Sequence, residues 1–165
     1  MTPEESFAEF YAASRDPCLR ALVASGTDRA AAEEAVAEAF ARAWASWPKV
    51  SRHPAPSAWV VRVALNHHVS RWRRTRREVA LTADVTDVAR DVDRIDSGER
   101  ADLLRAVAAL PERQRQVVAL RVFLDLDTKQ TAAALDLSTG TVTAHLHRAL
   151  TALRATVSPD LEVRP

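Results

Sequence analysis

Residues 128–153, TKQTAAALDLSTGTVTAHLHRALTAL, decide the fold of this chain. Thr128 can cap a short alanine-rich helix, a tight break follows around residue 137, and Ser138 can cap a second helix. The apolar residues of the second helix fall on one stripe, which consists of Val142, Leu146, Ala149, Leu150 and Leu153. Two short helices with a turn of roughly three or four residues are typical of a helix-turn-helix.

The face of the second helix that points away from this stripe suits contact with DNA. Arg148 can pair with a guanine edge or hold a phosphate, Thr141 can donate to either, and Ala144 suits a thymine methyl. The residues expected on this face or at its flanks are Thr139, Thr141, Thr143, Ala144, His145, His147 and Arg148. The motif therefore predicts a DNA-binding unit.

A further helix is predicted just before this motif. Residues 110–112 read LPE, where proline suits the first helical turn and glutamate suits the positive end of the helix dipole. Val117, Leu120 and Leu124 then line a face that we expect to be buried. The helices together predict a small domain over residues 103–157, with a tail at 158–165.

The first part of the chain predicts a separate helical domain over residues 1–77. Asp28 can cap a helix that Pro48 ends. Its apolar stripe, expected in the core, consists of Val36, Phe40, Trp44 and Trp47. The opposite face carries Glu34, Glu38 and Arg42. This second face is either a solvated surface or a docking surface.

A second long helix begins near Ser57, after the proline-broken loop WPKVSRHPAPS. One of its faces carries Val61, Leu65, His68 and Trp72. The other carries Trp59, Arg62, Asn66, Ser70, Arg73, Arg74 and Arg77. A helix face that is merely solvated usually mixes charge signs, yet no acid interrupts the arginines before Glu78. We therefore favour nucleic-acid contact over a plain solvated face.

Residues 78–102 carry eight acidic residues against three arginines and have no sustained apolar stripe. This composition predicts a flexible acidic linker between the two domains. The chain has only three glycines and is rich in alanine, leucine, arginine and glutamate. The expected fold class is therefore all-α, with two small helical domains joined by the linker.

Several classes of function are disfavoured by what the sequence lacks. The single cysteine, Cys18, excludes an intramolecular disulfide and a cysteine-rich zinc site, and its simplest interpretation is a buried apolar residue. No histidine pair has the i, i+4 spacing of a helical metal site, and neither a glycine-rich phosphate loop nor a nucleophile elbow is present. We expect that the protein is not an enzyme and that it binds no metal, no cofactor and no small-molecule substrate. No apolar run approaches the roughly 18 residues of a membrane span, so we expect a cytoplasmic protein without membrane insertion.

Residues 110–154 resemble region four of the extracytoplasmic-function (ECF) subfamily of bacterial sigma-70 factors, group IV. The family pattern LPxxxRxxxxLR, followed by A-x-x-L and S-x-G-T-V-x-x-x-L-x-R-A, matches LPERQRQVVALR, AAAL and STGTVTAHLHRA. Residues 33–47, EEAVAEAFARAWASW, are similar to the polymerase-docking helix of region two. Residues 56–78, PSAWVVRVALNHHVSRWRRTRRE, are similar to the helix that reads the minus-ten element.

The resemblance implies a sigma factor that binds core RNA polymerase and directs promoter-specific initiation of transcription. It places Glu34, Glu38 and Arg42 against the clamp helices of the polymerase large subunit, with region four on the flap. It places an unstacked minus-ten base between residues 50–58 and Asn66, and the minus-thirty-five element against the recognition helix. It also implies an anti-sigma factor as partner. Residues 34–38, EAVAE, lack the glutamine usual in the family, and residues 143–145, TAH, lack two usual cations.

Some interpretations stay open at this point. Trp47 or Trp59 can offer a stacking surface for a flipped base, but Trp47 fits the core better, and Trp59 fits both roles equally. The linker either follows the polymerase RNA path or shields the arginine-rich helix. The rival functions are a dimeric helix-turn-helix repressor or activator, and an adaptor whose helices only bind a protein partner.

Overall fold

The computed structural model describes the backbone of residues 1–78 and 99–157 and the side chains of 1–67 and 102–156. All regular structure in these residues is α-helical, which confirms the predicted all-α class. The tail at 158–165 and most of the predicted linker lie outside the described residues. Among the helices described, none combines the length and apolar character needed to cross a membrane.

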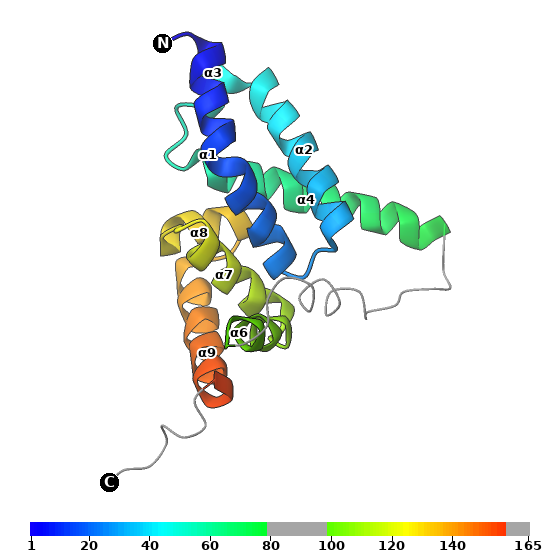
Figure 1. Ribbon diagram of the computed structural model, residues 1–165, viewed down its shortest axis with the longest axis vertical. Coiled ribbons are helices and arrows are strands. Elements are labelled where there is room, and N and C mark those ends of the chain that lie inside the picture. Colours follow the sequence, from blue (N-terminus) through cyan, green and yellow to red (C-terminus); the bar gives the residue numbers. More distant parts are fainter. Residues whose placement is uncertain (79–98, 158–165) are drawn as a thin grey trace.

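The N-terminal half consists of α1 (Pro3–Ala24), α2 (Arg29–Ala45), α3 (Trp47–Val50) and α4 (Pro56–Glu78). A capping box starts α1, because the Thr2 hydroxyl accepts from the Glu5 amide and the Glu5 carboxylate accepts from the Thr2 amide. The Asp28 carboxylate accepts from the Ala31 amide at 3.1 Å and caps α2 as predicted. Helices α1 and α2 lie side by side, and α4 crosses them (Figure 1).

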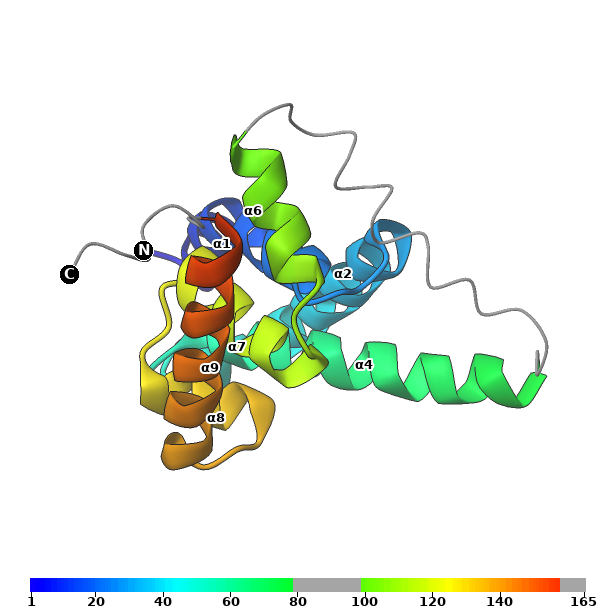
Figure 2. The same cartoon turned by 90° about the horizontal axis from the view of Figure 1, so that it is seen from below.

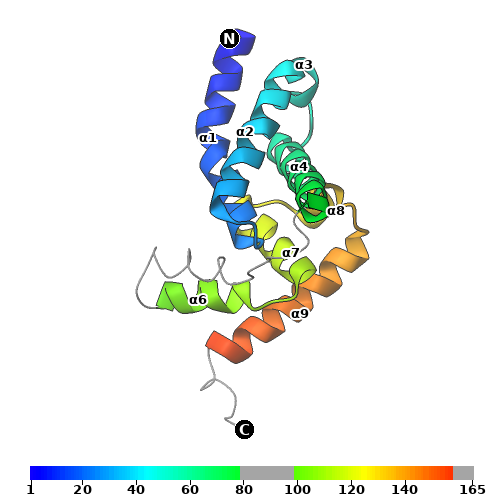
Figure 3. The same cartoon turned by 90° about the vertical axis from the view of Figure 1, so that its right-hand side faces the viewer.

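The C-terminal half consists of α6 (Glu99–Ala108), α7 (Glu112–Phe123), α8 (Thr128–Leu135) and α9 (Thr139–Val157). Helix α6 thus begins within the stretch assigned above to the linker. Between α8 and α9 the chain turns through Asp136, which has a left-handed φ of 55° that aspartate tolerates. Figure 3 shows α8 beside α4 and α9 running away from it, so the helix-turn-helix adjoins the first domain.

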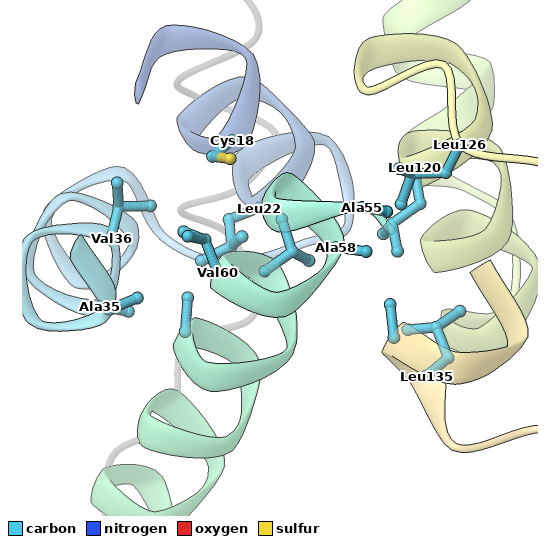
Figure 4. Close-up of a cluster of buried hydrophobic side chains, with 14 of the residues drawn as sticks. Cys18, Leu22, Ala35, Val36, Ala55, Ala58, Val60, Leu120, Leu126 and Leu135 are labelled. Atoms are coloured by element: carbon cyan, nitrogen blue, oxygen red, sulfur yellow. The ribbon is translucent and has the colours of Figure 1, made fainter. Parts of the chain in front are cut away.

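One hydrophobic cluster runs through both halves of the molecule. In the first half it contains Cys18 and Leu22 of α1 and Val60 of α4, each with no exposed surface. It continues into the second half through Leu120 of α7 and Leu135 of α8 (Figure 4). The two predicted domains therefore share a core instead of standing apart.

The buried stripe predicted for α2 is correct at Val36 and Phe40 and wrong at Trp44. Trp44 is 44% exposed, although its ring packs against that of Phe7 of α1, with the centroids 5.1 Å apart. Trp47 is 5% exposed, which confirms its interpretation as core. It belongs to α3 and not to α2, since α2 already ends at Ala45 and Pro48 lies in the first turn of α3.

Of the two caps predicted for the helix-turn-helix, one is confirmed and the other is wrong. Ser138 caps α9, and its hydroxyl accepts from the Thr141 amide at 3.1 Å. The predicted Thr128 cap of α8 is wrong, because Asp127 takes that position. The Asp127 carboxylate accepts from the Gln130 amide at 2.7 Å, and the Gln130 side chain accepts from the Asp127 amide at 3.0 Å.

Candidate nucleic-acid interface

The predicted nucleic-acid face of α4 borders a cavity of about 250 Å³. Trp59, Arg62 and Asn66 lie one helical turn apart in sequence, so they share a side of the helix. The cavity lies between α4 and the first helix of the helix-turn-helix, and its lining consists of His53, Ala58, Trp59, Arg62, Val63, Asn66, Ala133 and Ala134. The structure thus brings together the described members of the predicted face.

These side chains differ in exposure and in partners. Trp59 is half-buried and packs against the hydrophobic cluster, while Arg62 and Asn66 are exposed. The Arg62 guanidinium donates from Nη1 to the Ala133 carbonyl oxygen at 3.1 Å. His53, which belongs to the loop 50–58 that the resemblance places beside the minus-ten base, accepts at Nδ1 from the Ala55 amide at 3.0 Å and fixes the loop before α4. The apolar body of Trp59 and the two polar groups suit a base with a neighbouring phosphate.

The rest of the predicted face lies at the C-terminal end of α4. The side chains of Ser70, Arg73, Arg74 and Arg77 lie outside the described residues. The backbone of their helix projects away from the bundle, as Figure 2 shows from below.

The recognition helix α9 presents most of the predicted residues to solvent. Thr139, Thr143, His147 and Arg148 are exposed. Thr139, Thr143 and His147 follow one another at four-residue spacing, so they form one line along the helix. Thr141, Ala144 and His145 are half-buried beside this line.

Two of these side chains already have partners within the helix. The Thr141 hydroxyl lies 2.8 Å from the Ser138 hydroxyl, and the Thr143 hydroxyl donates to the Thr139 carbonyl at 3.0 Å. Each hydroxyl oxygen keeps a lone pair that can accept from a base edge. His145 turns its Nδ1 into the protein, where that atom has no hydrogen-bond partner. Among the predicted contacts, His147 and Arg148 are therefore the exposed side chains that offer ring or guanidinium nitrogens to DNA.

The predicted docking face on α2 is a charged and exposed surface. Its Glu38 carboxylate accepts from Arg42 Nε at 2.9 Å, an i, i+4 pair. Glu34 is exposed one turn earlier. A second i, i+4 pair of similar exposure, Arg29 with Glu33 at 3.3 Å, lies nearby on the same helix. Such exposed pairs stabilise a helix by only about 0.3–0.5 kcal/mol, so either pair can be broken without unfolding α2.

Arg115 connects the two halves of the molecule, which the sequence did not indicate. Its Nε donates to the Ser25 carbonyl at the end of α1 at 2.9 Å, and its Nη1 donates to the Ala108 carbonyl at the end of α6 at 3.0 Å. Both carbonyls lie at the negative end of a helix dipole, where a cation is favoured. Gly26, with a φ of 102°, leaves room for the guanidinium.

Arg115 also lines a second cavity between the halves, of about 590 Å³. Its other polar lining includes Arg62, Asn66, Arg113 and Gln116. No group of three or more metal-ligating side chains gathers within the described parts of the chain. Burial raises the pKa of the Cys18 thiol to about 12, which makes it a packing residue and not a reactive thiolate.

Comparison with known proteins matches each half of the chain to a conserved region of sigma-70 factors. The sigma-70 region 2 model matches residues 11–78, and the sigma-70 region 4 model matches residues 100–153. The chain is 32% identical over 159 residues to the RNA polymerase sigma-E factor of Streptomyces avermitilis, which covers 96% of this chain and 89% of that protein. It is 29% identical over 160 residues to the ECF RNA polymerase sigma factor RpoE of Cereibacter sphaeroides, which covers 94% of this chain and 88% of the relative.

A solved structure has the same arrangement of helices. It is the sigma factor RpoE in complex with the anti-sigma factor NepR from Bartonella quintana, and it matches with a TM-score of 0.70. The match covers 93% of this chain and 98% of that chain at 22% sequence identity, so it shows the fold.

Proposed function

Because the chain belongs to the extracytoplasmic-function group of sigma-70 family RNA polymerase sigma factors, we propose a role for each of its exposed functional faces. Members of this family are regulatory proteins and not enzymes, and this chain directs promoter-specific initiation of transcription. The observation that supports the assignment of roles is that one chain carries both a capped recognition helix and the Trp59, Arg62 and Asn66 face of α4.

We assign minus-ten recognition to the α4 face, within a domain over residues 1–77. Trp59 provides a partly exposed ring on which an unstacked base can lie, and stacking contributes about 1–3 kcal/mol per base. Asn66 can pair with the edge of that base, and Arg62 can hold a phosphate of the same strand. Ser70, Arg73, Arg74 and Arg77 continue this face along α4. Phosphate contacts dominate affinity here, so binding should fall steeply with added salt.

We assign minus-thirty-five recognition to α9, within a domain over residues 103–157. Thr139, Thr143, His147 and Arg148 form the exposed part of the surface that enters the major groove, with Thr141, Ala144 and His145 beside them. This surface has one arginine, so it gains little from non-specific attraction to phosphate. Region four therefore depends on polymerase, which holds it beside the promoter.

Arg148→Ala tests this assignment against a matched change on the same helix. We expect promoter binding by the reconstituted holoenzyme to weaken by about 1–3 kcal/mol, because a bidentate base contact or a phosphate contact is lost. Arg154→Ala removes another exposed arginine of α9 that lies almost two turns beyond Arg148, towards the C-terminal end of the helix and past the assigned residues, and it should leave binding near the wild-type value. Equal losses in the two variants would refute the assignment of this face.

We assign polymerase docking to Glu34, Glu38 and Arg42 on α2. Glu38→Lys reverses one charge of this face and breaks the exposed pair with Arg42. Glu33→Lys makes the same charge change and breaks the exposed pair with Arg29, one turn away and outside the assigned face. Core polymerase should co-purify poorly with Glu38→Lys and normally with Glu33→Lys. Equal recovery in both would refute the docking face.

The partners follow from the same assignment. Core RNA polymerase contacts α2 through its clamp helices and region four through its flap, and both α4 and α9 contact promoter DNA. We expect the protein in the cytoplasm, where the polymerase is. The solved relative is in complex with an anti-sigma factor, which supports an anti-sigma partner for this chain as well. Neither rival function, a dimeric repressor or an adaptor, requires matches to both sigma-70 regions.

A further inference from the structure

Three arginines line the cavity of about 590 Å³, Arg62 from α4 and Arg113 and Arg115 from α7. In the part of the chain that the structure describes, none of the three lies within ion-pair distance of a carboxylate. Other arginines of the molecule do pair with acids, as Arg42 does with Glu38 at 2.9 Å. Three cations around one cavity repel each other unless an anion lies between them.

Main-chain carbonyls hold each of the three guanidinium groups on one side and leave other nitrogens free. Arg62 donates from Nη1 to a carbonyl of α8 at 3.1 Å. Arg113 donates from Nη1 to the Leu135 carbonyl at 3.4 Å and to the Gln116 side chain at 3.2 Å. Both bonds of Arg115 also end on carbonyls. No Nη2 group of the three has a partner within the described residues, so fixed guanidinium groups keep free donors for phosphate oxygens.

The rest of the lining also suits an anion with a larger organic part. No side chain caps the N-terminus of α7 after Pro111, and the first turn of this helix borders the cavity. The positive end of a helix dipole favours an anion there. Asn66 and Gln116 add amide donors, and Leu65 adds apolar surface. The volume lies within the range of small-molecule sites.

We propose that this cavity binds a linear oligophosphate, either the di- or triphosphate chain of a nucleotide or the inorganic ion. Such a chain has enough oxygens and charge for several guanidinium groups at once, which sulfate lacks. The inference goes beyond the promoter-reading function. Arg113 and Arg115 belong to neither the DNA faces nor the polymerase face assigned above, so the site can be tested apart from them.

Two exposed carboxylates, those of Glu112 and Asp136, also line the cavity and oppose an anion. The Gln116 side chain donates from Nε2 to the Glu112 carboxylate at 3.5 Å. Asp136 has a φ of 55°, a left-handed conformation that asparagine tolerates as well. Asp136→Asn therefore removes one opposing charge and keeps the turn between α8 and α9, so it should tighten binding of the oligophosphate.

The test is titration calorimetry of the full chain with inorganic triphosphate, ATP and sulfate, at one fixed ionic strength and without magnesium. We expect one saturable triphosphate site, which Arg113→Gln weakens about tenfold because charge-assisted hydrogen bonds are lost. Arg20→Gln makes the same charge change at an exposed residue that lines neither cavity, and it should bind like the wild type. Asp136→Asn should bind about two- to fivefold more tightly, the effect of one exposed charge.

The two sources of the phosphate chain are separated by the same titrations. Tighter binding of ATP than of triphosphate supports a nucleotide as the occupant, because the cavity then also holds the base or sugar. Equal binding supports the phosphate chain alone.

Several results would overturn the proposal. These are the absence of saturable triphosphate binding, equal affinity in Arg113→Gln and Arg20→Gln, or sulfate that binds as tightly as triphosphate. Circular dichroism checks that Arg113→Gln is folded. If it is not, Asp136→Asn decides, and an affinity no higher than that of the wild type refutes the site. Failure of the proposal leaves the promoter-reading function standing, since that function is measured by transcription.

Discussion

Gly26→Ala tests how the two halves are joined, because a methyl group at this position opposes both the backbone and Arg115. The φ of 102° lies outside the range that L side chains usually adopt, which costs about 1–3 kcal/mol. The added Cβ would also lie 2.6 Å from Nη2 of Arg115, closer than real contacts allow. The guanidinium must move, and its bond to the Ser25 carbonyl, now 2.9 Å long, is weakened or lost.

The expected loss of stability combines these two effects. A hydrogen bond donated by a charged group contributes about 1.5–3 kcal/mol, and water recovers part of that at this half-buried site. We therefore expect Gly26→Ala to lower the free energy of unfolding by about 2–4 kcal/mol in urea denaturation. Arg115→Ala removes the atom that clashes, so in that background only the backbone strain remains.

A double-mutant cycle isolates the contact between the two halves. The Gly26→Ala and Arg115→Ala double variant should be more stable than additivity predicts, by about 1 kcal/mol or more. If the two losses of stability are additive within about 0.5 kcal/mol, Arg115 and residue 26 are not energetically coupled. A Gly26→Ala variant as stable as the wild type would refute the strain argument as well.

Three further predictions concern stability within each half. Ser138→Ala should cost about 1 kcal/mol, because α9 loses its cap, and thermal unfolding followed by circular dichroism measures the loss; an unchanged midpoint would count against the cap. Leu22→Ala should cost about 2–5 kcal/mol in urea unfolding, since this side chain is fully buried in the shared cluster; a loss under 1 kcal/mol would contradict that packing. The pKa of Cys18 is raised from 9.0 to about 12, so its contribution to folding stability is full below pH 9.0 and is lost as pH rises towards 12. Unfolding measured across that range against Cys18→Ala checks the sign, and an equal pH dependence in both proteins would contradict it.

The helices with a clear apolar period were predictable from the sequence, and α1 was not. Residues 110–154 and residues of α2 have apolar side chains at helical spacing and capping residues at the ends. These local features are enough to predict that the segments are helices and roughly where each helix begins and ends. In α1, Pro17 lies inside the helix and interrupts the local helical signal. The helix persists because Cys18, Leu19 and Leu22 are buried against α2, α4 and α7, and such tertiary packing outweighs propensity.

The sequence predicted the DNA-binding faces of α4 and α9 separately. It did not predict that the two halves of the molecule contact each other. The members of each face follow from helical periodicity, which is local. The bonds from Arg62 to Ala133 and from Arg115 to Ser25 join residues 71 and 90 positions apart, and no local pattern encodes them. Exposure at the edges of a stripe depends on the same long-range packing, as Trp44 and Leu150 show with 44% and 39% of their surface exposed.

Transcription from a genomic template pool, with core polymerase and this protein as the only sigma factor, tests the central claim most directly. We expect RNA to start at defined positions that share a minus-ten and a minus-thirty-five element, and Asn66→Ala and Arg148→Ala should relax the base preference of one element each. Starts no more frequent than with core polymerase alone would contradict the assignment of this chain as a promoter-reading sigma factor.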